Sequence, residues 1–296
     1  MRVGAIVPME VSDGPGREPT WPEMLGFVRH AEELGLDSVW VCDHLWAGWD
    51  DKPPENVHEA WTLLPALAAS TSRIELGELV SCISFRDPSL LAKMAVTTDE
   101  ISGGRIVLGL GAGWYDAEYR AFGFPTDHRV DRFEEALQII PPLLAGERVT
   151  FEGSYHAVDG ARLMPPPSRP IPILIAGEGP RMLGLTARYA DAWNTAWYAG
   201  PDDRLRKQFA VMDAALMAEG RDLATLRRTV GVAVRDPDAS EDRGSDDSPV
   251  FFGSVDEMAE LFDAYAALGV DDVILELGPK TERSLDRVAE AIARRG

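Results

Sequence analysis

Asp43 and His44 follow directly after a short β-rich run, Ser38 to Cys42, and form a residue pair suited to chemistry. Imidazole titrates near neutral pH, so a histidine at a strand end can give or take a proton in either direction of a reaction. Trp46 and Trp49 come soon after, and aromatic side chains suit the walls of a pocket for a flat ligand. We therefore predict proton transfer at His44 beside an aromatic pocket. The alternative is a structural histidine under tryptophans that close the core.

Glycines alternate at Gly109, Gly111 and Gly113, at the end of another β-rich run and just before Trp114. Residues without a Cβ allow a ligand to approach the backbone closely. The spacing differs from the dinucleotide-binding fingerprint G-x-G-x-x-G, and no acidic residue follows at the required place. The pattern therefore indicates either a ligand-binding backbone or tight packing alone.

A second glycine-rich stretch, Ala176-Gly177-Glu178-Gly179, lies where a β-rich run gives way to a predicted helix that contains Arg181. Backbone N–H groups at such a helix start, together with a guanidinium group, favour the binding of an anion. We therefore predict that a phosphate group binds near Gly177 to Arg181.

The residue spacing predicts no metal site and no familiar covalent nucleophile. Cys42 and Cys82 are too few for a disulfide framework or a four-ligand zinc site, and no G-x-S-x-G motif is present. A Schiff-base aldolase would need a lysine at a strand end, and only Lys52 comes near one. Four further histidines lack a His or Cys partner at metal-ligand spacing: His30, His58, His128 and His156.

These candidate residues sit in a sequence that alternates short β-rich runs with helical stretches. The alternation implies a parallel sheet, and eight such units in 296 residues fit a closed (β/α)8 TIM barrel better than an open sheet. The carboxyl ends of the strands then meet at one mouth, where active sites of such barrels lie. We predict a single domain over residues 1–296, with strands at 3–7, 38–42, 73–81, 105–110, 171–176, 192–195, 228–234 and 272–277.

Local signals mark several element boundaries and insertions. Thr20 with Glu23, and Ser254 with Glu257, have the spacing of capping boxes at helix starts. Asp127 is expected to cap the helix at 129–144. An alternating stretch around Phe151 to Tyr155 predicts a hairpin insertion. The Gly-, Pro-, Ser- and Asp-rich stretch at 236–249 is either a lid over the mouth or a disordered loop.

The composition excludes several classes of protein. Hydrophobic residues make up 45% and charged residues 26%, which is ordinary for a globular chain and excludes wholesale disorder. A formal charge of −20 disfavours nucleic acid and anionic membranes as partners. No apolar run reaches the length of a membrane span, and the N-terminal apolar stretch is too short for a secretory signal. We therefore expect a cytoplasmic protein that acts on a small molecule.

Taken together, several stretches resemble the luciferase-like monooxygenase superfamily, and the resemblance covers nearly the whole chain. Within it, the likeness is greatest to the actinobacterial coenzyme F-420-dependent oxidoreductases, chiefly through Glu59 to Leu64 and Gly113-Trp114-Tyr115. The other stretches are Val39 to His44, Arg86 to Lys93, Thr97 to Arg105 running into Gly109 to Trp114 and Glu118-Tyr119, and Ala187 to Asn194.

The resemblance implies a flavin or deazaflavin at the mouth of the barrel, with coenzyme F-420 expected and FMN as the alternative. It also implies a non-proline cis peptide at Leu79–Val80, or one residue later at Ser81, that supports the middle ring of the cofactor. Asp43 and His44 match the family's cofactor-edge and catalytic positions. The resemblance places these further residues at cofactor-binding positions: Gly111, Gly113, Ala176, Gly177, Glu178, Gly179 and Arg181.

One departure from the family concerns the substrate. In the sugar-phosphate dehydrogenases that the chain resembles, a glutamate follows the glycine run, and here Trp114 stands in that place. Glucose 6-phosphate is therefore an unfavourable substrate, and an apolar pocket is expected from Trp46, Trp49, Trp114 and Trp197. The leading hypothesis is a homodimeric oxidoreductase that uses coenzyme F-420. The alternative hypotheses are an FMN monooxygenase that receives reduced flavin from a partner reductase, a non-catalytic flavin-binding protein and an unrelated phosphate-binding barrel.

Overall fold

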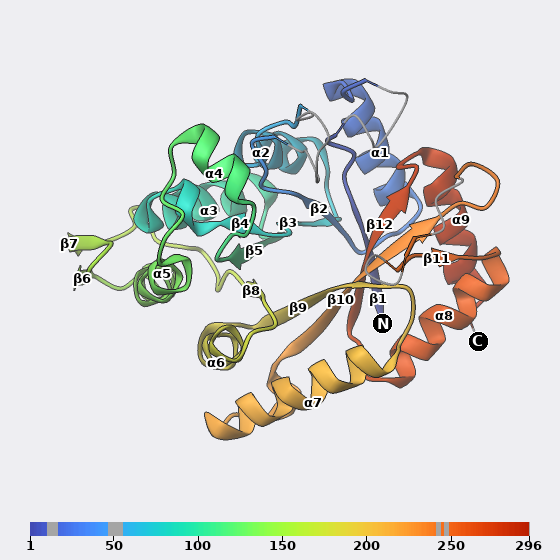
Figure 1. The fold of residues 1–296 in the computed structure, drawn as a ribbon. Coiled ribbons are helices and arrows are strands. Elements are labelled where there is room, and N and C mark those ends of the chain that lie inside the picture. Colours follow the sequence, from blue (N-terminus) through green and yellow to red (C-terminus); the bar gives the residue numbers. More distant parts are fainter. Residues whose placement is uncertain (11–16, 47–55, 241–243, 246–248, 296) are drawn as a thin grey trace.

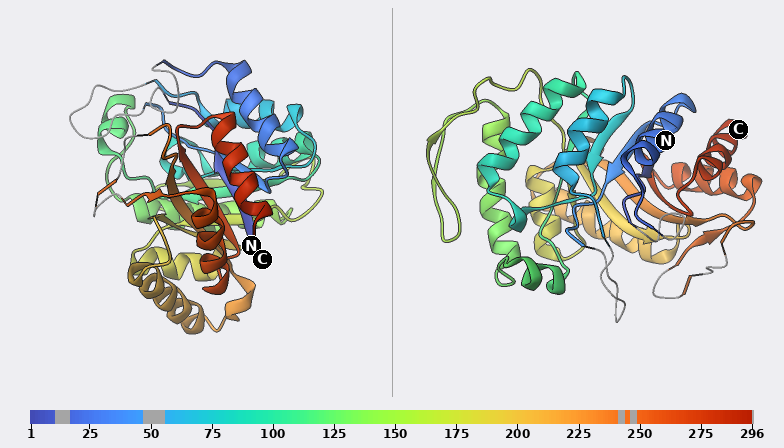
Figure 2. Two further views of the ribbon diagram at one scale, coloured as in Figure 1. Left: turned by 90° about the vertical axis from the view of Figure 1, so that its right-hand side faces the viewer. Right: turned by 90° about the horizontal axis from the view of Figure 1, so that it is seen from above.

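The computed structural model describes residues 1–10, 17–46, 56–240, 244–245 and 249–295, and it shows a ring of parallel strands surrounded by helices (Figure 1). The strands pair in the order β1-β2-β3-β5-β8-β9-β10-β12, and β12 pairs with β1 to close the ring. Helices cover the outside of this ring (Figure 2). The prediction of a (β/α)8 barrel is confirmed.

Each predicted strand corresponds to one position in the ring. The third is divided, because β3 and the short β4 are separated by Leu79 and Val80, whose peptide bond is cis as the resemblance implied. The bond between Ala196 and Trp197 is also cis. The ring strands are β1 (Arg2–Ile6), β2 (Ser38–Val41), β3 (Glu75–Glu78), β4 (Ser81–Cys82), β5 (Ile106–Gly111), β8 (Ile173–Ala176), β9 (Ala192–Tyr198), β10 (Arg227–Arg235) and β12 (Asp272–Gly278).

The helices follow the sequence signals closely, with one helix that those signals did not indicate, α4. Both capping boxes are formed, at Thr20 with Glu23 and at Ser254 with Glu257. The N-cap of α5 is His128, in a left-handed conformation, so the prediction that Asp127 caps this helix is wrong. The helices are α1 (Trp21–Glu33), α2 (Ala60–Ser70), α3 (Pro88–Ser102), α4 (Asp116–Phe122), α5 (Arg129–Leu144), α6 (Pro180–Tyr189), α7 (Asp203–Ala218), α8 (Val255–Ala267) and α9 (Glu282–Ala293).

Two additions extend the ring. The predicted hairpin is present as antiparallel β6 (Val149–Glu152) and β7 (Ala157–Ala161), and it projects from the barrel beside α5 (Figure 1). A short strand, β11 (Phe251–Phe252), pairs with the end of β10. Of the stretch 236–249, residues 241–243 and 246–248 lie outside the described residues.

Trp40 of β2 fills much of the space inside the ring. It is fully buried, and its indole N–H donates a hydrogen bond to Ser38 Oγ at 2.9 Å. Gly77 of β3 lies against this indole, and a Cβ there would overlap the ring. The remaining interior apolar side chains are Ile6, Val107, Leu174, Ala192 and Ile274, while a larger apolar layer lies between the strands and the helices.

In the part of the chain that the structure describes, no helix is long and apolar enough to cross a membrane.

Gly109 of β5 has no room for a side chain, because a Cβ there would overlap the carbonyl oxygen of Glu78. Gly109→Ala should therefore lower the free energy of unfolding by about 1–3 kcal/mol, the usual cost of overpacking, in a urea titration. Gly184→Ala within α6 is the matched control, because a Cβ there meets nothing within 4 Å. The control should be neutral or stabilising by about 0.5–1 kcal/mol, and equal stability of the two variants would contradict the packing argument.

Candidate functional site

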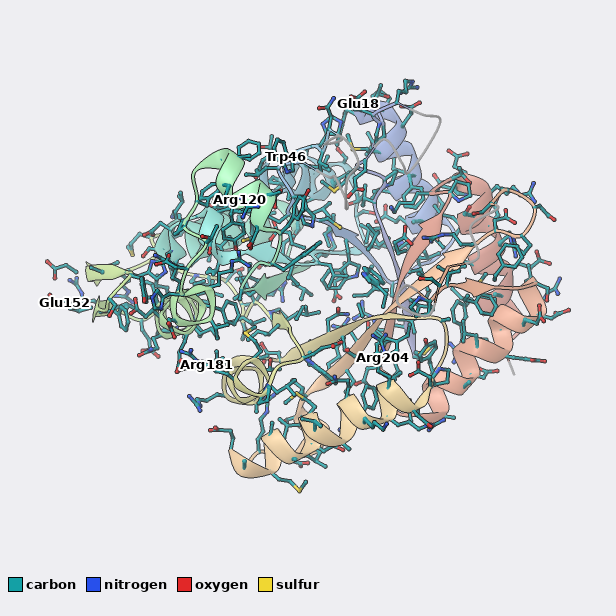
Figure 3. All side chains as sticks on the ribbon, viewed as in Figure 1. Glu18, Trp46, Arg120, Glu152, Arg181 and Arg204 are labelled. Atoms are coloured by element: carbon teal, nitrogen blue, oxygen red, sulfur yellow. The ribbon has the colours of Figure 1, made fainter. Side chains whose placement is uncertain are left out.

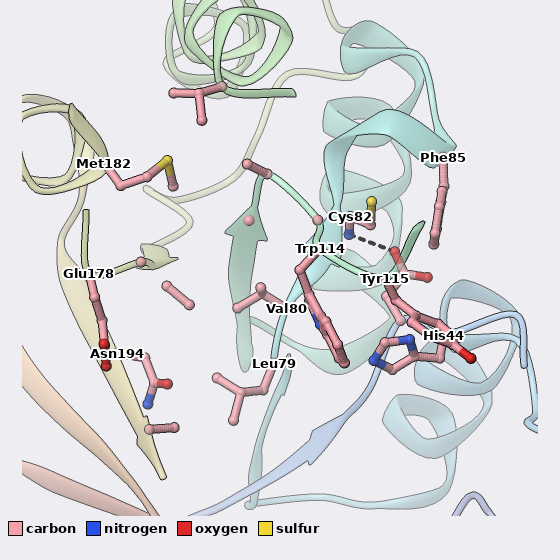
Figure 4. Close-up of a pocket in the computed structure, with 18 of the residues that line it drawn as sticks. His44, Leu79, Val80, Cys82, Phe85, Trp114, Tyr115, Glu178, Met182 and Asn194 are labelled. Carbon is pink, nitrogen blue, oxygen red and sulfur yellow. Dashed lines mark hydrogen bonds between the residues drawn. The ribbon is translucent and has the colours of Figure 1, made fainter. Parts of the chain in front are cut away.

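A cavity of about 650 Å³ opens at the carboxyl ends of the ring strands. His44, Trp114 and Tyr115 lie on one side of it and Glu178 and Asn194 on the other, with the Leu79–Val80 segment between them (Figure 4). Its volume is within the range of small-molecule sites. Eleven residues proposed from the sequence line it: Asp43, His44, Leu79, Val80, Gly111, Gly113, Trp114, Ala176, Gly177, Glu178 and Trp197.

His44 is held by a carboxylate that sequence reasoning did not single out, that of Glu118. The ring nitrogen Nδ1 lies 3.3 Å from Glu118 Oε2, and the imidazole stands nearly perpendicular to the indole of Trp114, with ring centroids 6.0 Å apart. Burial by itself disfavours the charged imidazolium, but the hydrogen bond and the negative charge of Glu118 outweigh it. The pKa of His44 is therefore raised, with smaller contributions from Glu10 and Asp43. The ring is suited to carry a proton near neutral pH.

Asp43 lines the cavity, but both of its carboxylate oxygens accept hydrogen bonds from other groups of the protein. Oδ2 accepts from the Cys82 backbone N–H at 2.8 Å and from Arg86 at 2.6 Å, while Oδ1 accepts from Arg86 at 2.9 Å. The same guanidinium also donates to Glu59, the N-terminal cap of α2. Burial raises the pKa of the Asp43 carboxyl, and Arg86 and the Cys82 amide counteract part of that rise. The carboxylate thus connects the end of β2 to β4.

Leu79 and Val80 form an apolar platform at the floor of the cavity, next to two glycines that have no room for a side chain. A Cβ on Gly111 would come within 2.5 Å of a Val80 methyl group. Gly113 has a positive φ of 79°, and a Cβ there would overlap the Tyr119 hydroxyl. An apolar platform beside Cβ-free backbone fits one face of a tricyclic flavin or deazaflavin ring.

Ser81 was proposed as a cofactor contact, but its side chain is buried beside the cavity and does not line it. Its Oγ accepts from the indole N–H of Trp61 at 3.2 Å and donates to Glu78. Glu78 is fully buried, and burial raises its pKa well above the ordinary range, which favours the uncharged form of this carboxyl. Ser81 therefore supports the platform from behind.

The far side of the cavity is built from the ends of β8 and β9. Gly177 accepts from the Trp193 indole N–H at 2.9 Å, and Glu178 accepts from Thr195 Oγ1 at 2.6 Å. The Thr195 hydroxyl also lies 2.9 Å from the Tyr198 hydroxyl. These bonds hold the glycine-rich stretch in place and leave its backbone along the cavity.

Arg181 does not reach the cavity, contrary to the prediction that it adds charge there. It projects from α6 at the surface (Figure 3), and its guanidinium pairs with Asp131 at 2.5 Å and Glu134 at 2.5 Å, both on α5. Gly179, its neighbour at the start of α6, is likewise outside the lining. Within the described lining there is no arginine or lysine. An anion near Gly177 would meet backbone N–H groups and not this guanidinium.

The four tryptophans proposed for a substrate pocket do not all lie in the cavity. Trp114 and Trp197 line the cavity and are 60% and 37% exposed, so both present apolar surface at its opening. Trp46 lies outside the lining and packs edge-on against Phe122 of α4, with centroids 5.7 Å apart. Trp49 lies outside the described residues. Across those described residues, no cluster of three or more His, Cys, Asp or Glu could hold a metal ion.

Comparison with known proteins decides the family. The family model described as luciferase-like monooxygenase matches residues 1–243. The chain belongs to the luciferase-like monooxygenase family. This membership agrees with the closed barrel and with the cavity at its carboxyl end.

Relatives of this luciferase-like chain include dehydrogenases named for coenzyme F-420. It is 34% identical over 239 residues to the F420-dependent hydroxymycolic acid dehydrogenase of Mycobacterium tuberculosis, covering 79% of this chain and 65% of the relative. It is 34% identical over 216 residues to the F420-dependent glucose-6-phosphate dehydrogenase of Kineococcus radiotolerans, covering 71% and 63%. The matches thus span less than two thirds of either relative's length.

Among solved structures, an F420-dependent secondary alcohol dehydrogenase in complex with an F420-acetone adduct matches with a TM-score of 0.82. The match covers 99% of this luciferase-like chain and 98% of the other, at 20% sequence identity. Similarity at this level of identity establishes the shared barrel fold.

The thiol of Cys82 should be unreactive although it lines the cavity. Burial raises its pKa to about 12, even though its sulfur lies 2.9 Å from the Tyr119 hydroxyl. At pH 8 it should hold about a thousandfold less thiolate than an ordinary exposed cysteine, and only the thiolate is alkylated. Iodoacetamide labelling followed by peptide mass spectrometry should find Cys82 protected in the native protein, reactive in urea, and increasingly labelled as the pH rises toward 12. Rapid native labelling at pH 8 would contradict the burial argument.

Proposed function

We propose that the protein is an oxidoreductase that uses coenzyme F-420 for hydride transfer to or from a small organic substrate. The observation that carries the proposal is His44, held by a buried carboxylate at the edge of an apolar platform in the cavity. When bound, the deazaflavin supplies a carbon that donates or accepts a hydride and reacts poorly with oxygen. The protein then has to orient the two reactants and exchange one proton, and His44 is placed to do the second.

The residues that would hold the cofactor divide into a platform and a backbone stretch. Leu79 and Val80 would lie under the ring, and Gly111 leaves the room that the Val80 side chain needs to keep its place in this platform. The stretch Ala176 to Glu178, which lines the cavity, would meet the phosphate through backbone N–H groups. Arg181 could join only by leaving Asp131 and Glu134.

For the substrate, we propose an uncharged, largely apolar molecule that carries an alcohol or carbonyl group. Trp114 and Trp197 offer it apolar surface, and Trp114 stands beside His44 where the proton is exchanged. A phosphate-bearing substrate would find no arginine or lysine along the described lining. Although one relative is named for glucose 6-phosphate, this lining favours a different substrate.

A second candidate uses the same cavity. The family is described as monooxygenases, and the apolar platform suits an FMN ring as well as a deazaflavin. In that case the chain would receive reduced flavin from a partner reductase. For either candidate we propose a cytoplasmic homodimer, on the resemblance to the family.

Cofactor choice is tested by titrating the protein with coenzyme F-420 and, separately, with FMN, followed by fluorescence or calorimetry. We expect saturable binding of F-420 in preference to FMN. Gly111→Ala should weaken that binding by about tenfold or more, because the new methyl group pushes Val80 into the ring space. Gly184→Ala, remote on α6, should bind as the parent does. Saturable FMN binding without F-420 binding would favour the monooxygenase.

Proton transfer is tested with His44→Ala. Turnover should fall by roughly 10²–10⁴-fold, the usual contribution of a positioned acid or base, while cofactor affinity stays nearly unchanged. His30→Ala is the control, because His30 pairs with Asp286 at the surface, on the outside of the barrel. The melting temperature should be measured on the same samples. Full activity per folded molecule, with only a lower melting temperature, would make His44 a structural residue.

A further inference from the structure

Glu118 joins the loop after β2 to helix α4 through one buried carboxylate. Its side chain is only 2% exposed. Oε1 accepts from the backbone N–H groups of Leu45 and of Trp46, the latter at 3.2 Å, while Oε2 lies 3.3 Å from His44 Nδ1. Three consecutive residues therefore share a single acceptor group. A buried carboxylate is tolerated only when it is hydrogen-bonded in this way.

Helix α4 is anchored at both of its ends. Phe122 of α4 packs edge-on against Trp46, which follows His44 in the loop. At the start of α4, Arg129 of α5 pairs with Asp116 and also donates to the Trp114 carbonyl oxygen at 3.2 Å. Helix α4, which carries Glu118, thus fixes the position of the loop 44–46 relative to Trp114 in the cavity lining.

The chemistry of a carboxylate also sets which nitrogen of His44 carries hydrogen. An ionised carboxylate only accepts hydrogen bonds, so the imidazole must present N–H at Nδ1 to Glu118. Nε2 is then the nitrogen that exchanges a proton with a substrate. The charged groups that bear on the ring are Glu118 from α4, Glu10 from beyond β1 and the adjacent Asp43, and all three favour the imidazolium against burial.

We propose that Glu118 is a positioning residue for His44: it fixes the loop 44–46 and keeps the Nδ1 hydrogen in place while Nε2 exchanges the reacting proton. The inference rests on the role proposed above for His44, which is the group that would meet the substrate.

The first test observes His44 without cofactor or substrate. Nitrogen-15 NMR titration of the histidine rings, assigned with His44→Ala, should give a lower His44 pKa in Glu118→Gln than in the parent protein. Glutamine keeps the size of the side chain and an oxygen for the backbone N–H groups, but it removes the charge. The Nδ1-protonated form of the neutral ring should also lose population, because an amide can turn its NH2 group toward the ring.

The matched control is Glu135→Gln. Glu135 accepts from the backbone N–H groups of Ser154, Tyr155 and His156 at 2.7–2.9 Å, so the same chemistry is removed from a hairpin turn instead of the site. This variant should leave the His44 titration unchanged. Glu118→Asp, which retains the charge, should recover most of the parent pKa. It also serves as the second variant if Glu118→Gln unfolds.

The second test measures turnover. Glu118→Gln should lower kcat by about tenfold to a hundredfold with KM and cofactor affinity little changed, because a misplaced reacting group loses rate and not binding. In the direction of alcohol oxidation, the acid limb of the pH profile should move to lower pH, since a base with a lower pKa is deprotonated at lower pH.

The outcomes separate this inference from the proposed function. An unchanged His44 titration and an unchanged pH profile in Glu118→Gln would overturn the positioning role. If the titration shifts as expected but His44→Ala retains full turnover, Glu118 still positions His44 while the proposed function of His44 fails. A titration that shifts equally in Glu135→Gln would show a general effect of charge removal, and this would also overturn the inference.

Discussion

The bidentate contact between Asp43 and Arg86 is the constraint on which the cavity depends. The Asp43 carboxylate comes from the end of β2, takes the backbone N–H of Cys82 in β4, and is completed by an arginine that also reaches the cap of α2. Removing one partner of a buried ion pair typically costs about 3–5 kcal/mol, because the other charge is left unpaired. The contact therefore determines where the platform of Leu79 and Val80 lies relative to His44.

Acidic groups crowd this part of the barrel, and each is accommodated differently. Burial raises the pKa of Glu78 well above the ordinary range and so favours its uncharged form. Asp43 and Glu59 share the single guanidinium of Arg86. Glu118 has backbone N–H groups and the imidazole of His44. Arg86 thus pairs with the acids that support the platform. His44 is the group whose pKa responds to the charge of Glu118.

Local signals predicted the elements well, because they depend on residues near one another in sequence. The bounds of α5 agree with the helix expected at 129–144, the helix expected around Arg181 is present as α6, and every expected ring strand is present. The short helix α4 had too few residues for a periodic apolar pattern, so its presence and the position of Glu118 could not be foreseen. Glu118 was visible only as part of a family motif, without a role.

The site was harder to predict than the elements, because its decisive contacts join residues far apart in the chain. Arg181 looked like an anion ligand from its neighbours alone, but its partners Asp131 and Glu134 lie on another helix. Ser81 follows the cis bond as expected, but its hydroxyl turns to Glu78 and Trp61. In both cases the sequence predicted the right backbone position and could not indicate which way the side chain would turn.

The two carboxylates beside His44 illustrate how environment separates identical chemical groups. Asp43 precedes His44 in the chain, but its charge is directed to Arg86 and it contributes least to the His44 pKa among the three nearby acids. Glu118 has no arginine within its described contacts, so its charge acts on the imidazole. Exchanging these partners would leave the histidine without its acceptor and the platform without its anchor. The different roles of the two carboxylates therefore follow from which of them Arg86 reaches.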